Sequence, residues 1–355
     1  MTEAEAWLRL GLIPGLGPAA LRRLLADFGA PDVAAAASGP SLANSVGEAL
    51  AAAIRRGPDP ALLEDSLRWA GKAGNRLLTL ADGEYPRRLL EIPDPPPLLY
   101  ATGDPSLLAR QALAIVGSRN ATAQGAANAE AFARELSDSG FVIVSGLALG
   151  IDAAAHRGGL SGAASSVAVV GTGLDIVYPA RNRALARELA AGGLLLSEFA
   201  LGTPPLAANF PRRNRLISGL ARGVLVVEAA LQSGSLITAR CALEQGREVF
   251  AVPGSIHSPL SKGCHLLIKQ GAKLAETARD ILEELGAVAP LQSRGLPQAR
   301  EDSVLLAALG YDPVDLDTLC ARSGLTAEDA SAMLLTLELE GVVAKLPGGR
   351  FQRVR

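Results

Sequence analysis

Residues 112–120 read Ala-Leu-Ala-Ile-Val-Gly-Ser-Arg-Asn, a short apolar run that enters a glycine turn. An apolar run without a polar position is typical of a strand buried on both faces of a parallel sheet. Further apolar runs follow at 141–144, 166–170, 193–196, 223–227, 248–252 and 272–274. Helix-like segments separate most of them, at 124–138, 183–191, 236–244 and 261–270. This alternation predicts an α/β fold with a Rossmann-like parallel sheet as its core, spanning residues 112–286.

Two segments precede this core. Residues 1–80 have helical apolar spacing and predict a helical domain. Within it, Ile13-Pro-Gly-Leu-Gly-Pro18 fits a helix-hairpin-helix turn that would contact a phosphate, and equally a plain turn between two helices. Residues 81–111 are rich in proline and predict an extended connection.

Two segments follow the core. Residues 287–302 have the composition of a linker. Residues 303–355 predict three helices, at 304–309, 315–323 and 326–340, and then a hairpin, which is the pattern of a winged-helix domain. The third helix carries Glu328, Asp329, Glu338 and Glu340 and no lysine or arginine. We therefore expect it to have a protein-contact or regulatory role rather than to bind duplex DNA.

The composition limits how this chain could bind a polyanion. Its 355 residues carry a net charge of −2, so binding would need a local basic patch. Aromatic residues are only 4% of the chain, which makes Phe210 a scarce residue. The three cysteines are far apart and predict reduced thiols and no metal site. No apolar run approaches the length of a membrane span and the first residues are acidic, so we expect a cytoplasmic protein.

The turns after the predicted strands indicate a phosphate-containing ligand. They hold Gly117, Ser118 and Arg119, then Ser145, Gly146 and Asp152, then Asp175, and then Ser233 and Ser235. Strand ends of a parallel sheet meet at one edge, and we expect the helix N-terminus after Arg119 to add positive potential there. Between the strands lies Asn209-Phe-Pro-Arg-Arg-Asn-Arg215, with arginines at 212, 213 and 215. Guanidinium groups beside an aromatic ring suit single-stranded nucleic acid.

Several signatures of enzymes are missing from the sequence. The first strand has no GxGxxG turn and the chain has no GxxxxGK[ST] loop, so we expect neither a dinucleotide cofactor nor a P-loop. His156, His257 and His265 each lack a neighbouring catalytic or metal-ligand pattern. Acid–base roles are possible for three acidic residues, Asp152, Asp175 and Glu228. A structural role, in which they cap helices or hold arginines in place, is the better fit for all three. We predict no catalytic residue.

The turns, in this order, resemble those of the DNA-processing protein A family (DprA, also called Smf). The matching elements include Ile115-Val-Gly-Ser-Arg119, Gly171-Thr-Gly-Leu-Asp175, Tyr178-Pro179, Arg213-Asn-Arg215 and Ser233-Gly-Ser-Leu-Ile-Thr238. The resemblance implies single-stranded DNA binding, a homodimer formed through the Rossmann-like domain, and loading of the recombinase RecA onto DNA in natural transformation and homologous recombination.

The same resemblance implies the residues of the DNA site. They are Gly117, Ser118, Arg119, Ser145, Gly146, Arg181, Arg183, Phe210, Arg212, Arg213, Asn214 and Arg215, with Asp152, Asp175, Ser233 and Ser235 in supporting turns. Ala180 departs from the family pattern, in which a basic residue often follows Tyr-Pro, so Arg181 or Arg183 would replace that contact.

An enzyme of the lysine-decarboxylase-like (LOG) phosphoribohydrolase type is the alternative. That type shares the sheet and the glycine-rich turns, and it has a PGGxGTxxE signature. The nearest stretch here, Glu228-Ala-Ala-Leu-Gln-Ser-Gly-Ser235, has no proline and places its glutamate before the turn.

Overall fold

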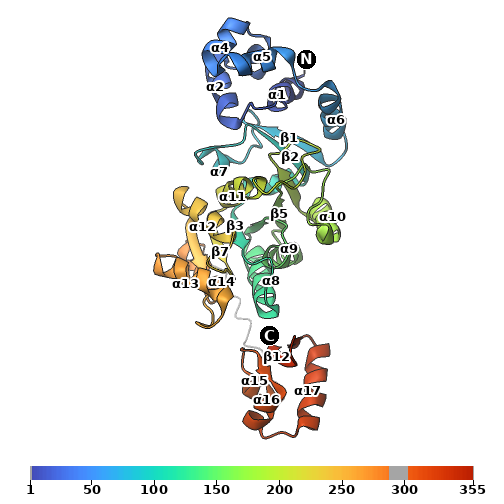
Figure 1. Ribbon diagram of the computed structural model, residues 1–355, viewed down its shortest axis with the longest axis vertical. Helices are drawn as coiled ribbons and strands as arrows, with labels where there is room; N and C mark the ends of the chain where they lie inside the picture. Colours follow the sequence, from blue (N-terminus) through green and yellow to red (C-terminus); the bar gives the residue numbers. More distant parts are fainter. Residues whose placement is uncertain (1, 288–302, 355) are drawn as a thin grey trace.

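A nine-stranded sheet forms the centre of the molecule, in the order β1-β2-β6-β5-β4-β3-β7-β8-β9 (Figure 1). The computed structural model describes residues 2–287 and 303–354, so the predicted linker lies almost entirely outside the described residues. Strands β3 to β9 pair in parallel, which confirms the predicted Rossmann-like α/β core. These strands are β3 (Ala112–Val116), β4 (Val142–Ser145), β5 (Ser166–Val169), β6 (Leu194–Ser197), β7 (Gly223–Val226), β8 (Glu248–Ala251) and β9 (Lys273–Leu274).

Helices cover both faces of the sheet because its strands are apolar on both sides. One face packs against α11, α12 and α13, and the other against α8, α9 and α14. The helices of this part are α8 (Ala123–Asp138), α9 (Ile151–Ser161), α10 (Arg183–Gly192), α11 (Asn209–Leu220), α12 (Ser235–Glu244), α13 (Lys262–Lys269) and α14 (Ala278–Glu284), with the short 3₁₀ helices η2 (Ala180–Asn182) and η3 (Pro259–Ser261).

The structure differs from the sequence expectation before residue 112. Strands β1 (Asn75–Thr79) and β2 (Leu98–Gly103) pair with each other and extend the sheet, and β2 runs antiparallel to β6. Helix α7 (Arg87–Leu90) and the 3₁₀ helix η1 (Pro105–Ala109) lie in the same segment. The prolines of residues 81–111 therefore lie between structured elements. Leu99 and Tyr100 of β2 are buried.

The N-terminal helices are α1 (Glu3–Gly11), α2 (Pro18–Phe28), α3 (Pro31–Ala36), α4 (Gly39–Val46), α5 (Glu48–Arg56) and α6 (Pro60–Ala70). Helices α1 to α5 share an apolar cluster at one end of the molecule, whereas α6 packs with α1 against Tyr100 of β2 (Figure 1). Proline stands in the first turn of α2, α3, α4 and α6, where its missing N–H has no cost.

The C-terminal part is a winged helix, as predicted. Three helices pack around Leu305, Leu319 and Leu334, and a small sheet in the order β10-β12-β11 completes the unit. The elements are α15 (Ser303–Leu309), β10 (Val314–Asp315), α16 (Leu316–Ser323), α17 (Ala327–Leu339), β11 (Val343–Leu346) and β12 (Arg350–Arg353).

Candidate nucleic-acid interface

Aromatic rings and a free cation meet at the carboxyl edge of the sheet. The half-buried ring of Phe210 lies directly on Gly171, where an added Cβ would stand 3.0 Å from the ring. The Tyr178 ring is 5.6 Å away, centroid to centroid, and 45% of Tyr178 is exposed. The exposed Arg119 guanidinium lies 5.7 Å from the Phe210 centroid. We name these four residues the ring platform. Tyr178 was not among the predicted site residues, although it is an exposed aromatic residue in a chain poor in them.

The positive helix end at this edge belongs to α11 rather than to α8. Nothing among the described side chains caps the N-terminus of α11, and its first turn holds Phe210 and Arg212 and no acidic residue. Its partial positive charge is therefore not neutralised. The N-terminus of α8 was expected to play this role. It is occupied instead, because Thr122 donates its N–H and its hydroxyl to the Glu228 carboxylate at 2.9 and 2.6 Å. Thr122 is the N-cap of α8 and accepts from the Gly125 N–H at 2.9 Å, so Glu228 holds the capping residue in place.

Arg213 supports the turn after β4 from inside the protein. Only 4% of Arg213 is exposed, and it donates to the carbonyl oxygen of Val169. An added Cβ at Gly146 would lie 2.0 Å from its guanidinium, so only glycine fits there. Burial lowers the pKa of Arg213 to about 10, and the nearby Asp152 opposes this shift. Arg213 remains a cation at neutral pH, but its position corrects the expectation of a surface charge: the helix turns it inward.

Two predicted backbone donors are already used within the protein. The Ser118 N–H donates to the Glu228 carbonyl at 2.7 Å, and the Gly146 N–H donates to Asp152 Oδ2 at 3.1 Å. The Ser145 hydroxyl is buried and donates to the Ile115 carbonyl at 2.6 Å. The expected cradle of free amides around a phosphate is therefore not present at these positions, because the turns satisfy their own polar groups.

His156 holds the same turn in place. Ser166 donates its hydroxyl to the Ile143 carbonyl, so the 2.8 Å contact between Ser166 Oγ and His156 Nδ1 requires an N–H on Nδ1. The other ring nitrogen, Nε2, then accepts from the Leu147 N–H at 3.2 Å. Leu147 has a φ of 56°, which is unfavourable for a branched residue. Burial lowers the pKa of His156 to about 3 and keeps this tautomer neutral.

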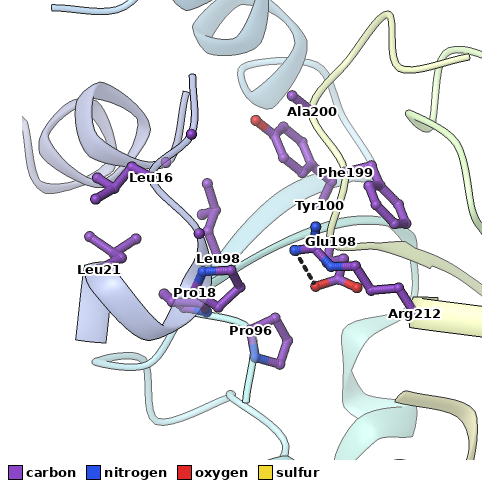
Figure 2. Close-up of a pocket in the computed structure, with 14 residues that line it drawn as sticks. Leu16, Pro18, Leu21, Pro96, Leu98, Tyr100, Glu198, Phe199, Ala200 and Arg212 are labelled. Carbon is purple, nitrogen blue, oxygen red and sulfur yellow. Dashed lines mark hydrogen bonds and ion pairs between the residues drawn. The ribbon is translucent and has the colours of Figure 1, made fainter. Parts of the chain in front are cut away.

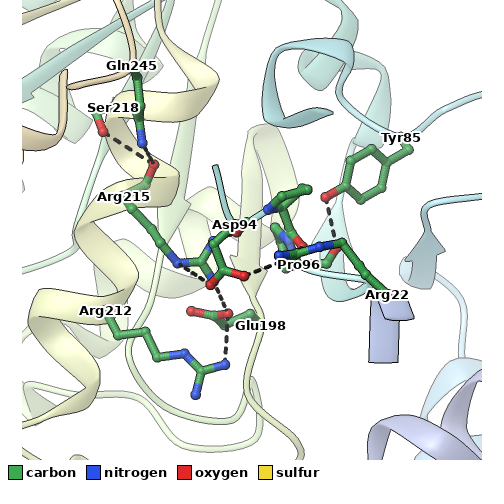
Figure 3. A network of polar contacts seen from close by, with 10 residues as sticks. Arg22, Tyr85, Asp94, Pro96, Glu198, Arg212, Arg215, Ser218 and Gln245 are labelled. Carbon is green, nitrogen blue, oxygen red and sulfur yellow. Dashed lines mark hydrogen bonds and ion pairs between the residues drawn. The ribbon is translucent and has the colours of Figure 1, made fainter. Parts of the chain in front are cut away.

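Arg215 and Arg212 meet on a buried carboxylate (Figure 3). The side chain of Glu198 is 1% exposed and pairs with both, at 3.2 Å from Arg212. Arg215 also contacts Asp94, which pairs with Arg22 of α2 at 2.7 Å. Arg215 is 13% exposed and Arg212 is 45% exposed, so only Arg212 presents its charge to solvent. Glu198 had not been predicted, because a single glutamate after a strand carries no distinctive pattern.

The other predicted residues divide into free cations and turn supports. Arg181 in η2 and Arg183 at the start of α10 are both exposed, and within the described ranges neither has an ion pair. Asn214 donates to the Gly234 carbonyl at 3.3 Å. The supporting contacts are Asp175 with the Gly202 N–H at 2.9 Å and Ser233 with Ser235 at 2.7 Å between hydroxyl oxygens.

No helix in the described part of the chain is long and apolar enough to cross a membrane. In the same part of the chain, no group of three or more histidine, cysteine, aspartate or glutamate side chains is arranged to hold a metal ion.

Together, the doubly covered parallel sheet and the cationic, aromatic carboxyl edge define a Rossmann-like protein with a candidate nucleic-acid-binding edge. Residues 76–286 match the family model of DNA recombination-mediator protein A, and residues 289–349 match that of the DprA winged helix domain. The chain therefore belongs to the DNA processing protein A (DprA/Smf) family, and the phosphoribohydrolase alternative is not favoured.

Relatives and solved structures agree with this assignment. The chain is 45% identical to Protein Smf of Escherichia coli over 302 residues, covering 81% of this chain and 80% of that protein. It is 48% identical to DNA processing protein DprA of Streptococcus pneumoniae over 206 residues, covering 58% and 73%. The X-ray structure of the S. pneumoniae protein matches with a TM-score of 0.71 at 39% identity, covering 80% and 98%. A Helicobacter pylori structure described as showing a single-stranded DNA binding mode matches with a TM-score of 0.54 at 33% identity, covering 59% and 95%.

Proposed function

We propose that this DNA-processing family protein binds single-stranded DNA at the ring platform and loads the recombinase RecA onto it during transformation and recombination. The ring platform is the observation that carries the proposal. Phe210 offers an aromatic face whose far side rests on Gly171, and stacking of a base on such a ring contributes about 1–3 kcal/mol. The Arg119 guanidinium lies over the Phe210 ring and supplies charge for a phosphate of the bound strand.

Four cations then line the DNA path: Arg119, Arg181, Arg183 and Arg212. The remaining predicted arginines act indirectly in this proposal. Arg213 fixes the turn after β4, and Arg215 neutralises Glu198 beneath the path. The supporting turns hold these groups in position, and the protein performs no chemistry on the strand.

The RecA and dimer parts of the proposal rest on family membership. The H. pylori structure, described as showing a single-stranded DNA binding mode, supports single-stranded DNA as the ligand. We further propose a cytoplasmic homodimer that assembles through the Rossmann-like domain, since incoming DNA and RecA are met in that compartment.

The test combines binding with RecA assembly. Titrations of a fluorescent oligo-dT should show affinity lowered by about 5- to 150-fold in Phe210→Ala, which corresponds to the loss of one stacked base. RecA assembly on the same oligonucleotide should be accelerated by wild type and not by this variant. Unchanged binding in Phe210→Ala would exclude the ring platform, and normal acceleration by a variant that does not bind DNA would exclude loading from this site.

A further inference from the structure

A cavity of about 290 Å³ lies between the N-terminal helices and the central sheet, away from the ring platform (Figure 2). The turn before α2 lines one side, including Gly15 and Gly17. Pro96, the loop after β6 and Arg212 line the other. This turn belongs to residues 13–18, whose sequence fits a phosphate contact and a plain turn between two helices equally well.

The cavity contains features that suit an anion. Gly17 occupies the N-cap of α2 and provides no side-chain cap, and the first turn of α2 has no acidic residue. The positive end of an 11-residue helix is therefore not neutralised at the cavity wall. Arg212 lines the same cavity and has 45% of its side chain exposed. A helix N-terminus beside a guanidinium group is suited to a phosphate.

Glu198 indicates that the ligand also carries a hydrogen-bond donor. Its carboxylate lines the cavity beside Arg212, as Figure 2 shows. Oε2 is used by Arg212 and Arg215, whereas Oε1 is buried and has no hydrogen-bond partner within the described residues. An unpaired buried acceptor is costly, and Oε1 is buried in this structure, so a shift of the side chain towards the cavity would let an N–H group of a ligand pair with it. Pro96 and Phe199 add apolar surface suited to the face of a ring.

We propose that this cavity binds a second nucleotide of the same single strand that the ring platform holds. Its phosphate lies between the α2 N-terminus and Arg212, and its base lies against the apolar wall with an N–H edge towards Glu198. Phe210 and Arg212 are two positions apart in the first turn of α11, so this turn separates the two sites. The inference rests on the proposed function and extends the strand from the sheet onto the N-terminal helices.

Gly17 allows a matched pair of variants. No atom lies within 4 Å of a Cβ added at Gly17, and its φ of −73° suits any residue. Gly17→Asp and Gly17→Ser both supply a helix cap, and only the aspartate places a negative charge in the phosphate position. The probes are fluorescent oligo-dT strands of about 6 and about 15 nucleotides, the shorter to occupy the ring platform alone.

We expect Gly17→Asp to bind the longer strand about fivefold more weakly than wild type and the shorter strand equally well. Gly17→Ser should retain wild-type affinity for both. Wild-type affinity of Gly17→Asp for the longer strand would overturn the proposal, as would an equal loss for both strands. The two claims fail separately, because Phe210→Ala tests the ring platform on either strand.

Single abasic substitutions along the longer strand test the base contact. We expect binding to weaken at two separate positions, and Gly17→Asp should abolish the effect at one of them. Weakening at a single position would overturn the placement of a base in the cavity.

Discussion

Salt should weaken oligonucleotide binding by an amount set by the number of arginines whose charge the fold leaves exposed to solvent. If all six predicted arginines met phosphates, the slope of log affinity against log salt would be about −4 for a single strand. The structure buries Arg213 and leaves Arg215 only 13% exposed on Glu198, whereas Arg119, Arg181, Arg183 and the 45% exposed Arg212 present their charge to solvent. Four contacts predict a slope of about −2.8, so raising salt from about 50 to 200 mM should weaken binding about 50-fold.

Replacing Arg119 with glutamine should reduce the magnitude of this slope by about 0.7. The assay is anisotropy of a fluorescent oligo-dT at several salt concentrations. Arg279→Gln is the control, because Arg279 on α14 is exposed and already paired with Glu283. A slope near −4 in wild type would refute the conclusion that Arg213 and Arg215 are held inside, and an unchanged slope in Arg119→Gln would refute its phosphate contact.

Three further predictions concern the support of the site. The pKa of His156 is about 3 in the folded protein and about 6.5 in the unfolded chain. As the pH falls below about 6.5, the unfolded chain binds a proton that the folded protein does not, so the free energy of unfolding decreases. By urea unfolding, the free energy of unfolding of wild type should be about 2 kcal/mol lower at pH 5 than at pH 7 through this residue, and His156→Gln should lack that contribution. Gly146→Ala should destabilise the protein by about 1–3 kcal/mol, because the added Cβ would meet the buried Arg213. Gly234→Ala is the control, because a Cβ at Gly234 would lie in open space; thermal unfolding of both variants measures the difference. Arg215→Met should lower the free energy of unfolding by about 3–5 kcal/mol, because it leaves the buried Glu198 with one partner fewer. The double variant with Glu198→Gln should recover part of that stability in urea unfolding, and no recovery would contradict the pairing.

The sequence predicted the sheet well because its strands are apolar on both faces and end at glycine turns. It did not predict that β1 and β2 join the sheet, since Asn75–Thr79 is short and the prolines before β2 suggested a loop. Pairing with β6 supplies hydrogen bonds that no local pattern reveals.

Chemistry-bearing residues were found by type, but their direction was not predictable. Arg212 and Arg213 are adjacent, and the 100° rotation between successive helical positions sends one to solvent and the other into the protein. Glu198 and His156 were missed as parts of the site for a related reason. Their partners, Arg215 and the Leu147 amide, are defined only by the fold.

The most direct measurement is a crystal structure of the protein with a short oligo-dT. We expect one base stacked on Phe210 and a neighbouring phosphate within reach of Arg119, at the carboxyl edge of the sheet. A strand bound elsewhere, with Phe210 and Arg119 free of nucleotide, would contradict it.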